Sequence, residues 1–322
     1  IIFRNLMAEK FQAVVIGGGP GGYVCAIRLS QLGFKTACVE ARNTLGGTCL
    51  NVGCIPSKSL LNLSENFQKA KKFHNLGIEV GEVKLNLEKM MKNKEKSVSI
   101  LTKGVEFLFK KNKVTYIKGK GVLFSKNDIV VYDQNKKTNY KSDNIVIATG
   151  SEVTSLPNLK IDEKNVISST GALSLNKVPK KLAVIGGGYI GLEMGSVWSR
   201  LGSDVTVIEY LDHITPGMDK EISYEFKKIL TKQGIKFKMS SKVDSVKDTG
   251  KGVSINYTDI KNSKAETLVV DKVLVSVGRK PYTEGLNLSK VGVKKDNKGR
   301  IEVNDKLQTS IKNIYAIGDV IK

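Results

Sequence analysis

Several residue types are scarce in this chain, and each scarcity excludes a class of protein. Cysteine occurs four times in 322 residues, too few for a scaffold held together by disulfides. Histidine occurs twice, and neither His74 nor His213 completes a four-ligand site with a cysteine pair, so we expect no metal. Apolar runs of about 18 residues are lacking, so we expect no membrane-spanning helix and no membrane partner.

Arginine is also scarce, although the chain is strongly basic. The formal net charge is +21, but only six of the 52 basic residues are arginines, and the lysines are scattered rather than set in a stripe with aromatic side chains. Base readout and stacking on RNA favour arginine and aromatic residues. We therefore predict a solvated lysine coat and no nucleic-acid partner, which leaves attraction to acidic partners open.

The length and composition indicate a globular protein of about two domains. Residues 1–10 have no secretory pattern and are expected to be an N-terminal extension, with the remnant of a basic leader as the alternative.

The first organised region is a strand–turn–helix–strand unit. Its elements are expected at residues 11–16, 17–22, 23–32 and 34–39. The turn carries the GxGxxG pattern on Gly17, Gly19 and Gly22, and Glu40 stands at the end of the second strand. The glycines permit close backbone approach, the helix start attracts a pyrophosphate, and the carboxylate can accept ribose hydroxyls. This context predicts a dinucleotide site, which GxGxxG alone would not.

The same unit returns later in the chain. Its strand, turn, helix and second strand are expected at residues 181–185, 186–191, 190–201 and 204–208. Gly186 repeats Gly17 and Glu209 repeats Glu40, both at an offset of 169 residues. A carboxylate at Glu209 would repel a 2′-phosphate, so this second site is expected to prefer NAD to NADP.

A cysteine segment at residues 46–58 follows the first unit and contains Cys49, Cys54 and Lys58. In a regular helix these cysteines would have Cα atoms about 8.6 Å apart, whereas a disulfide needs less than about 7 Å. A bond between them therefore requires a distorted or unstarted helix, which Gly53 permits; a metal pair is the rival interpretation. Cys25 and Cys38, in an expected helix and strand, are predicted to be buried and inert. A dithiol exchanging electrons with nicotinamide needs a two-electron carrier between them, and a flavin fits.

The remaining pattern is less regular. Helices are expected at 57–71, 86–111 and 219–233, a small antiparallel sheet within 114–140, strands at 144–150, 269–277 and 313–320, and a linker near Pro157 and 160–165. Core candidates on the second of these helices are Met90, Ile100, Leu101, Phe107 and Leu108.

Taken together, several motifs resemble those of the flavoprotein disulfide reductases. They are the cysteine segment, the two glycine turns and residues 191–198, 277–281 and 316–319. Within that family, the sequences of the cysteine segment and of the residues around Glu193 are most similar to those of the dihydrolipoamide dehydrogenases. The resemblance covers nearly the whole chain. It implies an α/β fold with two Rossmann-like FAD/NAD(P)-binding domains of glutathione-reductase type, in three layers with a parallel sheet plus a small antiparallel sheet.

The resemblance also implies residue roles. Cys49 would exchange with a dihydrolipoamide sulfur, Cys54 would contact the flavin, and Lys58 paired with Glu193 would lie near the flavin N5. Electrons would run from the substrate dithiol through the cysteine pair and FAD to NAD⁺. The implied FAD-binding residues are Gly17, Gly19, Gly22, Glu40, Gly47, Thr48, Lys58, Gly119, Thr149, Gly150, Ser151 and Asp319. The implied NAD-binding residues are Gly186, Gly188, Ile190, Gly191, Glu209, Val243, Gly278 and Arg279.

The implied organisation is an FAD-binding domain at 11–150, an NAD-binding domain at 151–280 and a return segment at 281–322. The family continues with a C-terminal dimerisation domain that carries a His–Glu acid/base pair. We expect this chain, without that domain, to be impaired in lipoamide turnover and not to form the family's homodimer.

The implied partner is dihydrolipoamide on the lipoyl domain of an acyltransferase, in a 2-oxoacid dehydrogenase complex. The implied location is the mitochondrial matrix, with the cytoplasm for a bacterial source or the plastid as alternatives. Two other functions remain open. One is a glutathione- or mercuric-type reductase, and the other is a catalytically silent FAD/NAD-binding fragment that serves as a partner surface.

Overall fold

A computed structural model describes residues 8–157 and 159–322, and these divide into two compact units. Unit 1 contains the described residues up to Asn51 together with Val98–Glu152 and Arg279–Lys322. Unit 2 contains Val52–Ser97 and Val153–Gly278. The predicted extension at 1–10 lies mostly outside the described residues, and its last two residues, Glu9 and Lys10, belong to the first strand.

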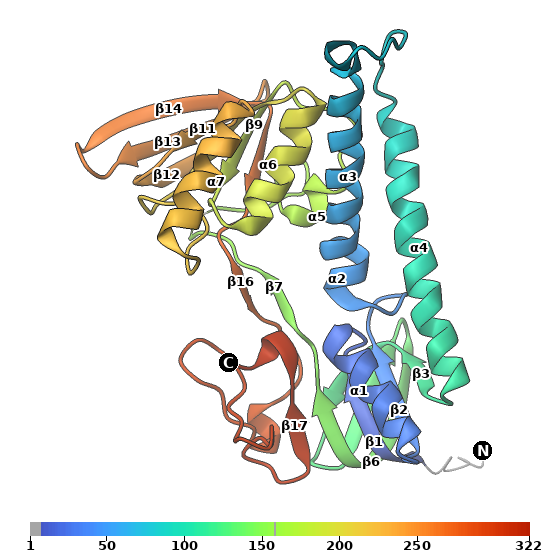
Figure 1. Cartoon of the computed structure of the whole chain (residues 1–322). Helices are drawn as coiled ribbons and strands as arrows, with labels where there is room; N and C mark the ends of the chain where they lie inside the picture. The colour runs from blue at the N-terminus through green and yellow to red at the C-terminus, as the bar shows by residue number, and fades with distance from the viewer. Residues whose placement is uncertain (1–7, 158) are drawn as a thin grey trace. The chain divides into compact units, whose positions relative to one another are not determined.

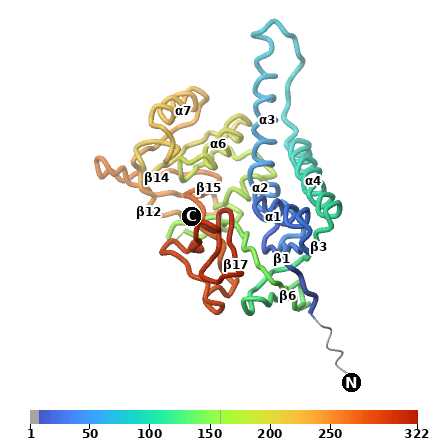
Figure 2. Tube along the Cα trace, turned by 60° about the horizontal axis from the view of Figure 1, so that its bottom comes forward, coloured from blue at the N-terminus to red at the C-terminus, as the bar shows by residue number. Residues whose placement is uncertain are grey.

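Unit 1 is built on a seven-stranded sheet (Figures 1 and 2). Its strands are β1 (Glu9–Ile16), β2 (Thr36–Glu40), β3 (Thr115–Lys118), β4 (Lys120–Leu123), β5 (Asp128–Asp133), β6 (Lys136–Ile147) and β17 (Ile314–Ala316). The order is β3-β2-β1-β6-β5-β4, and β17 pairs with the end of β6. Strands β3, β2, β1, β6 and β17 run parallel, while β5 is antiparallel to both of its neighbours, β6 and β4. The strands predicted within 114–140 thus extend this sheet instead of forming a separate one.

The second half of the central strand β1, residues 13–16, is buried because it is apolar on both faces, as parallel strands with helices on their faces usually are. Helix α1 (Pro20–Gln31) follows it directly and has proline in its first turn, where no backbone donor is needed. The last strand, β17, returns from the far end of the chain to lie beside β6, and its Ile314 is fully buried. Unit 1 therefore has one core built from both ends of the described chain.

Unit 2 contains a five-stranded parallel sheet in the order β11-β10-β9-β15-β8. Its strands are β8 (Val166–Ile167), β9 (Lys181–Ile185), β10 (Asp204–Ile208), β11 (Lys236–Lys238) and β15 (Lys272–Val275). Its helices are α3 (Cys54–Ala70), α5 (Ser169–Ala172), α6 (Tyr189–Leu201) and α7 (Lys220–Lys232). Residues Leu60 and Phe67 of α3 pack into the same core as Trp198 of α6. The cysteine-segment helix therefore belongs to the packing of unit 2.

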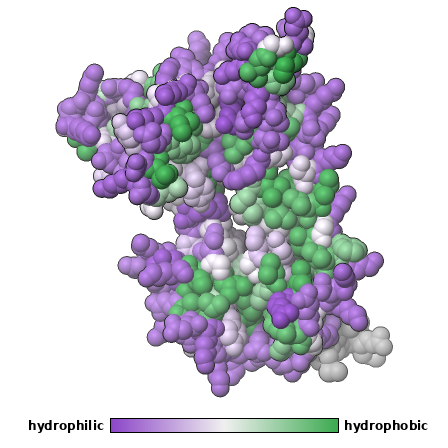
Figure 3. All heavy atoms as spheres, viewed as in Figure 1, coloured by the Kyte–Doolittle hydropathy of each residue, from purple (hydrophilic) through white to green (hydrophobic). Residues whose placement is uncertain are grey.

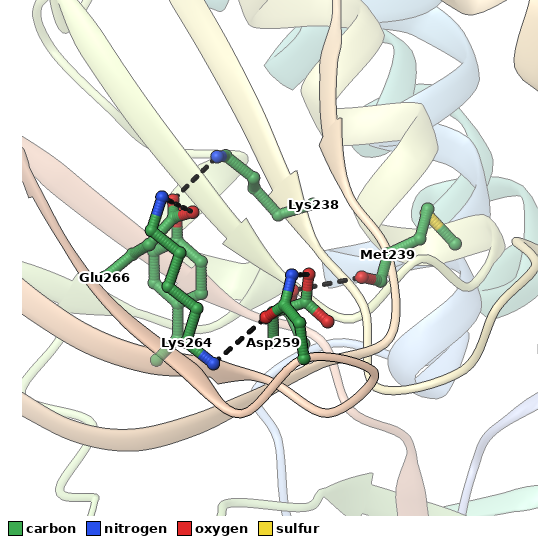
Figure 4. Close-up of polar contacts among 8 residues, drawn as sticks. Lys238, Met239, Asp259, Lys264 and Glu266 are labelled. Atoms are coloured by element: carbon green, nitrogen blue, oxygen red, sulfur yellow. Dashed lines mark hydrogen bonds and ion pairs between the residues drawn. The ribbon is translucent and has the colours of Figure 1, made fainter.

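A three-stranded antiparallel sheet completes unit 2, and the sequence did not predict its strands. They are β12 (Ser241–Asp248), β13 (Val253–Asp259) and β14 (Lys264–Val270). The strand predicted at 269–277 is present as β15, but its predicted start was too early, because residues 269 and 270 end β14 and β15 begins at Lys272. Lys238 and Lys264 converge on Glu266 here, with N–O distances of 2.8 and 3.9 Å (Figure 4).

Helix α4 (Leu87–Lys111) corrects another expectation. Four of its predicted core residues are exposed, namely Ile100, Leu101, Phe107 and Leu108, while Met90 is partly buried. The buried residues are instead Lys94, Thr102, Val105 and Phe109. Apolar atoms are correspondingly visible along α4 among hydrophilic ones (Figure 3). Lys94 is tolerated inside because its ammonium donates to the carbonyl of Leu173 at 2.6 Å.

The other elements are short or lie between the units in sequence. They are α2 (Gly47–Val52), β7 (Ser151–Val153), β16 (Arg279–Pro281) and the 3₁₀ turns Phe73–Leu76, Ser289–Val291 and Gly318–Val320. None of the helices among the described residues is long and apolar enough to cross a membrane. The domain boundaries at 150 and 280 stay a prediction.

Candidate nucleotide and dithiol sites

The first glycine turn joins β1 to α1 in a conformation that only glycine fits. Gly17 has φ +111°, and a Cβ added at Gly22 would lie 1.7 Å from the carbonyl oxygen of Gly17. The carboxylate of Glu40 is 7% exposed and accepts from the backbone N–H of Gly18 and of Arg42, each at 2.8 Å. The acid at the end of β2 is thereby fixed beside the turn, as a ribose-binding residue requires.

A second backbone segment lies directly against this turn. The N–H of Gly46 donates to the carbonyl of Gly18 at 2.8 Å, and a Cβ added at Gly47 would lie 2.5 Å from the Cα of Gly19. Gly47 has φ +57° and begins α2, so Thr48 follows in the first turn of that short helix. The start of the cysteine segment therefore covers the first glycine turn.

The second turn, between β9 and α6, repeats the geometry in unit 2. Gly186 has φ +104°, and a Cβ at Gly191 would lie 2.4 Å from the carbonyl oxygen of Gly186. The carboxylate of Glu209 is 7% exposed and accepts from the N–H of Gly187 at 2.5 Å and of Leu211 at 2.8 Å.

The other residues predicted at this site lie around the same sheet edge or beside it. Gly188 is the N-cap of α6 and Ile190 lies in its first turn. Val243 lies in β12 and packs against the core of unit 2, and Gly278, with φ +125°, follows the end of β15. Ser276 was not predicted; its hydroxyl donates to the carbonyls of Ile185 and Gly186 at 3.0 and 3.2 Å and supports the turn.

A third group of predicted residues meets in unit 1. The hydroxyl of Ser151 donates to Asp319 Oδ2 at 2.9 Å and accepts from Arg279 Nε at 2.7 Å. The hydroxyl of Thr149 donates to the carbonyl of Tyr282 at 2.6 Å, and Gly150 has φ +71°. Arg279, which the sequence placed with the nicotinamide site, here holds Ser151, whose bond to Asp319 ties it to the Gly318–Val320 turn.

Gly119 also lies close to the first site. It has φ +132°, and its N–H donates to the backbone carbonyl of Glu40 at 2.9 Å. The neighbouring Tyr116 has a pKa raised to about 12, because burial and the negative charge of Glu40 both oppose its ionisation.

The cysteine segment is a helix interrupted between its two sulfurs. Helix α2 ends at Val52, Gly53 has φ −141° and ψ −117°, and α3 begins at Cys54. Cys49 is half-buried and Cys54 is exposed. The break is the departure from regular helix that a Cys49–Cys54 disulfide requires, although the disulfide itself stays a prediction.

Asn51 holds the loop before the break and was missed from the sequence. Its amide donates to the carbonyls of Leu45 and Gly47 at 3.1 and 2.8 Å, and it accepts from Thr44 at 2.7 Å. A signal was present, because the side chain of an asparagine close to glycines commonly bonds to the nearby backbone.

Glu193 of α6 meets the beginning of α3. Its Oε1 lies 2.6 Å from Lys58 Nζ, and its Oε2 accepts from the hydroxyl of Ser57 at 2.5 Å. The pairing of Lys58 with Glu193 was predicted, whereas Ser57 was not. A cation is thus held one helical turn after Cys54, and the sulfur itself lies at the positive end of the α3 dipole.

The other two cysteines differ in character from the pair. Cys38 is fully buried in β2, and burial with the charge of Glu40 raises the pKa of its thiol. Cys25 in α1 is half-buried, and burial raises the pKa of its thiol too. Both thiols are held in the protonated, unreactive form, as expected of structural cysteines.

Comparison with known proteins agrees with this arrangement. A family model described as pyridine nucleotide-disulphide oxidoreductase matches residues 11–322. The chain is 54% identical over 316 residues to the mitochondrial dihydrolipoyl dehydrogenase of Pisum sativum, covering 98% of this chain and 63% of that protein. It is 57% identical over 311 residues to the dihydrolipoamide dehydrogenase of Chaetomium thermophilum, covering 95% and 61%.

Among solved structures, the HOCl-induced flavoprotein disulfide reductase RclA from Escherichia coli is 28% identical, with a TM-score of 0.83, over 96% of this chain and 66% of that one. Two glycine turns, an interrupted cysteine helix and this likeness define a flavoprotein-disulfide-reductase fold, so the predicted α/β class is confirmed. The chain belongs to the pyridine nucleotide-disulphide oxidoreductase family. It spans about three-fifths of the length of the curated relatives it matches.

Proposed function

We propose that this chain carries the redox centre of an NAD-dependent dihydrolipoamide dehydrogenase. The observation that carries the proposal is the Glu193 contact, which fixes a cation beside the start of the cysteine helix and joins that helix to the one after the second glycine turn. Relatives named dihydrolipoyl or dihydrolipoamide dehydrogenase at 54% and 57% identity support this substrate over glutathione or mercuric ion.

The residues of the first turn fit FAD. Exclusion of a Cβ at Gly22 by the carbonyl of Gly17 shows that α1 begins close against the turn, and the first N–H groups of a helix have no helical acceptor and can bind a pyrophosphate. Glu40 would accept the adenosine ribose hydroxyls, and Asp319 would hold the ribityl chain. Bound FAD would supply two-electron transfer between a thiol pair and nicotinamide.

The residues of the second turn fit NAD. Glu209 is anchored by two backbone donors, and its oxygens retain lone pairs for a ribose diol. The same carboxylate would repel the 2′-phosphate of NADP. Dinucleotide choice would therefore be set mainly by the charge of Glu209.

The overall reaction would be the oxidation of a dithiol by NAD⁺. Dihydrolipoamide loses two electrons and two protons as its S–H groups become a disulfide, and NAD⁺ takes up a hydride as one proton is released. In the exchange, a substrate thiolate attacks Cys49, the Cys49–Cys54 bond breaks, and Cys54 leaves as a thiolate. Lys58, held by Glu193, places a positive charge near the segment in which that negative charge forms.

The proposed substrate carrier, oligomeric state and location rest on the relatives. The substrate would be presented by the lipoyl domain of an acyltransferase, and a homodimer would be the working form of the whole protein. The mitochondrial name of relatives such as that of Pisum sativum supports the mitochondrial matrix as the proposed location.

Anaerobic spectroscopy tests the redox assignment. NADH should bleach the bound flavin and raise long-wavelength absorbance, and Cys54→Ser, which removes the thiolate that would contact the flavin, should abolish that absorbance while leaving flavin bound. Cys25→Ser is the matched control and should behave like the unaltered chain. Bound flavin without the absorbance, or a Cys54→Ser variant equal to its control, would contradict the proposal and favour a silent nucleotide-binding fragment.

The substrate assignment needs a separate measurement. Dihydrolipoamide should reduce the cysteine pair in anaerobic stopped-flow mixing, and reduced glutathione at equal thiol concentration should not. The reverse preference would indicate a glutathione-type reductase.

A further inference from the structure

Ser57 occupies a position that the family chemistry above does not use. It lies in α3 between Cys54 and the cation of Lys58, and its side chain is 5% exposed. Its hydroxyl donates to Glu193 Oε2, while the ammonium of Lys58 takes Oε1 at 2.6 Å. One carboxylate is therefore held by two consecutive residues, through one oxygen each.

The two contacts are unequal in rigidity. The side chain of Lys58 is 60% exposed and long, whereas that of Glu193 is 26% exposed. A lysine of this exposure loses considerable rotamer freedom in a fixed pair and gains little from the charge contact alone. Serine has a single χ angle leading to its hydroxyl, and burial fixes that angle. The contact that sets the orientation of the carboxylate is therefore the one from Ser57.

The helix geometry explains why both contacts form. Consecutive helical residues point about 100° apart, so Ser57 and Lys58 approach Glu193 from different directions. The N–H of Ser57 donates to the carbonyl of Gly53 at 3.0 Å, which ties the serine to the break between the two cysteine helices. The hydrogen bond to a charged acceptor is also stronger than one to a neutral group.

We propose that Ser57 is a positioning residue that orients the Glu193 carboxylate and thereby holds the Lys58 ammonium in place. Any effect of Ser57 on a flavin, exerted through the position of Lys58, rests on the proposed function. The effect of Ser57 on Lys58 itself does not. Loss of the hydroxyl should let the carboxylate rotate and release Lys58 into solvent.

The first test uses the chain with flavin removed. Trace labelling of amines with acetic anhydride, read by peptide mass spectrometry, reports how freely the amine of Lys58 reacts. Ser57→Ala should be labelled at Lys58 about threefold faster. This is the factor expected when most of the stabilisation from a typical exposed ion pair is lost. Ser57→Thr, which keeps the hydroxyl, should remain near the unaltered rate.

Ser64→Ala is the matched control. Ser64 lies on the same helix, is fully buried, and donates its hydroxyl to the carbonyl of Leu61 rather than to Glu193. It should leave Lys58 labelling unchanged. Equal labelling of Ser57→Ala and the unaltered chain, or an equal increase in Ser64→Ala, would overturn the proposal.

A cycle with Glu193 separates positioning from a general loosening of the helix. In Glu193→Ala the Lys58 amine should already react fast, and adding Ser57→Ala should change nothing further. Independent, multiplying effects would overturn the proposal. If Ser57→Ala does not fold, the same cycle can be run with Ser57→Val, which matches Ser57→Thr in shape but has no hydroxyl.

A spectroscopic readout links the residue to the redox site. In the flavin-loaded chain, Ser57→Ala should shift the pH profile of the long-wavelength absorbance formed with NADH, and Ser57→Thr should restore it. If the unaltered chain forms no such absorbance, the proposed function fails while the labelling result still decides the role of Ser57. If the absorbance forms and Ser57→Ala leaves its profile unchanged, the link between Ser57 and the redox site fails.

Discussion

The two glycine turns share a register but differ in what covers them. Over the first turn, the backbone at Gly47 comes so close that a Cβ there would lie 2.5 Å from Gly19. Over the second, a Cβ added at Gly188 would meet no heavy atom of the described residues within 4 Å. Both acids, Glu40 and Glu209, are equally buried and equally anchored. The two turns thus anchor their acids in the same way, but a covered turn would suit a cofactor that stays bound and an open turn would suit one that exchanges.

The largest effect on stability should come from adding a methyl group at the last glycine of each turn, where there is no room for it. Gly22→Ala places a Cβ 1.7 Å from the Gly17 carbonyl, whereas Gly191→Ala places one 2.4 Å from the Gly186 carbonyl and 2.5 Å from the Ser276 hydroxyl, which can rotate. We expect Gly22→Ala to lower the free energy of unfolding by about 3 kcal/mol and Gly191→Ala by about half as much. Urea unfolding measures both, and a larger loss at Gly191 would contradict this ranking.

Substitution of the two acids, Glu40 and Glu209, should affect the binding of two different cofactors. Glu209→Ala should weaken NADH binding about 10- to 100-fold, as expected for losing hydrogen bonds to a charged group, and should leave flavin content unchanged. Glu40→Ala should lose flavin instead. Glu209→Gln is the control that retains an acceptor oxygen for the turn. Titration calorimetry with NADH and flavin absorbance measure the two effects, and the division of roles fails if either variant loses both ligands.

Alanine variants of the middle glycines of the two turns, Gly19 and Gly188, should separate an effect on ligand binding from an effect on protein stability. A Cβ at Gly19 would be 3.6 Å from Gly47, and Gly188 has open space, so either alanine variant should change the free energy of unfolding by less than about 0.5 kcal/mol. Gly188→Ala should nevertheless weaken NADH binding, because the added methyl group occupies the place where a phosphate approaches the backbone. Thermal melts without and with NADH measure this, and an unchanged NADH shift would sink the idea.

The smallest effect should be the alkaline pH dependence of the two units. Tyr116 of unit 1 has a pKa raised to about 12, and burial with the hydrogen bond to Glu266 raises the pKa of Tyr257 in unit 2. A raised pKa in the folded state stabilises the fold fully below pH 10, and this stabilisation is lost as the pH rises through the folded value. Tyr116→Phe should flatten the loss of stability above pH 10 more than Tyr257→Phe. Urea midpoints between pH 8 and pH 12 measure both slopes, and steeper slopes in the variants would contradict the sign.

The glycine turns could be predicted because each is local. A turn, a helix start and an acid at the next strand end lie within thirty residues, and β9 and β10 have the predicted bounds. The face of α4 could not be predicted in this way. Its sequence offers Ile100 and Phe107 to a core, but the packed side carries Lys94, which is satisfied by Leu173, a residue 79 positions away. Tertiary partners of this kind leave no periodic signal.

The antiparallel sheet of unit 2 escaped prediction for a related reason. Strand β12 is an edge strand whose exposed residues are charged, as Lys242 and Asp244 are, so the apolar alternation there is weak. Ser57 was missed because a small polar residue in a helix is uninformative until its partner is known. Its partner, Glu193, lies 136 residues away. The Lys58–Glu193 pair was found only because the family resemblance supplied it.

The position of the single tryptophan makes it an optical reporter of one unit. Trp198 is fully buried in the core of unit 2, and its indole N–H donates to the carbonyl of Ala172 at 3.1 Å. Its emission should therefore be blue-shifted in the native protein and move to the red only when unit 2 opens. Flavin held by the first turn would report on unit 1 through its visible absorbance. Following the two colours in one denaturation series would show whether the units unfold together or in sequence.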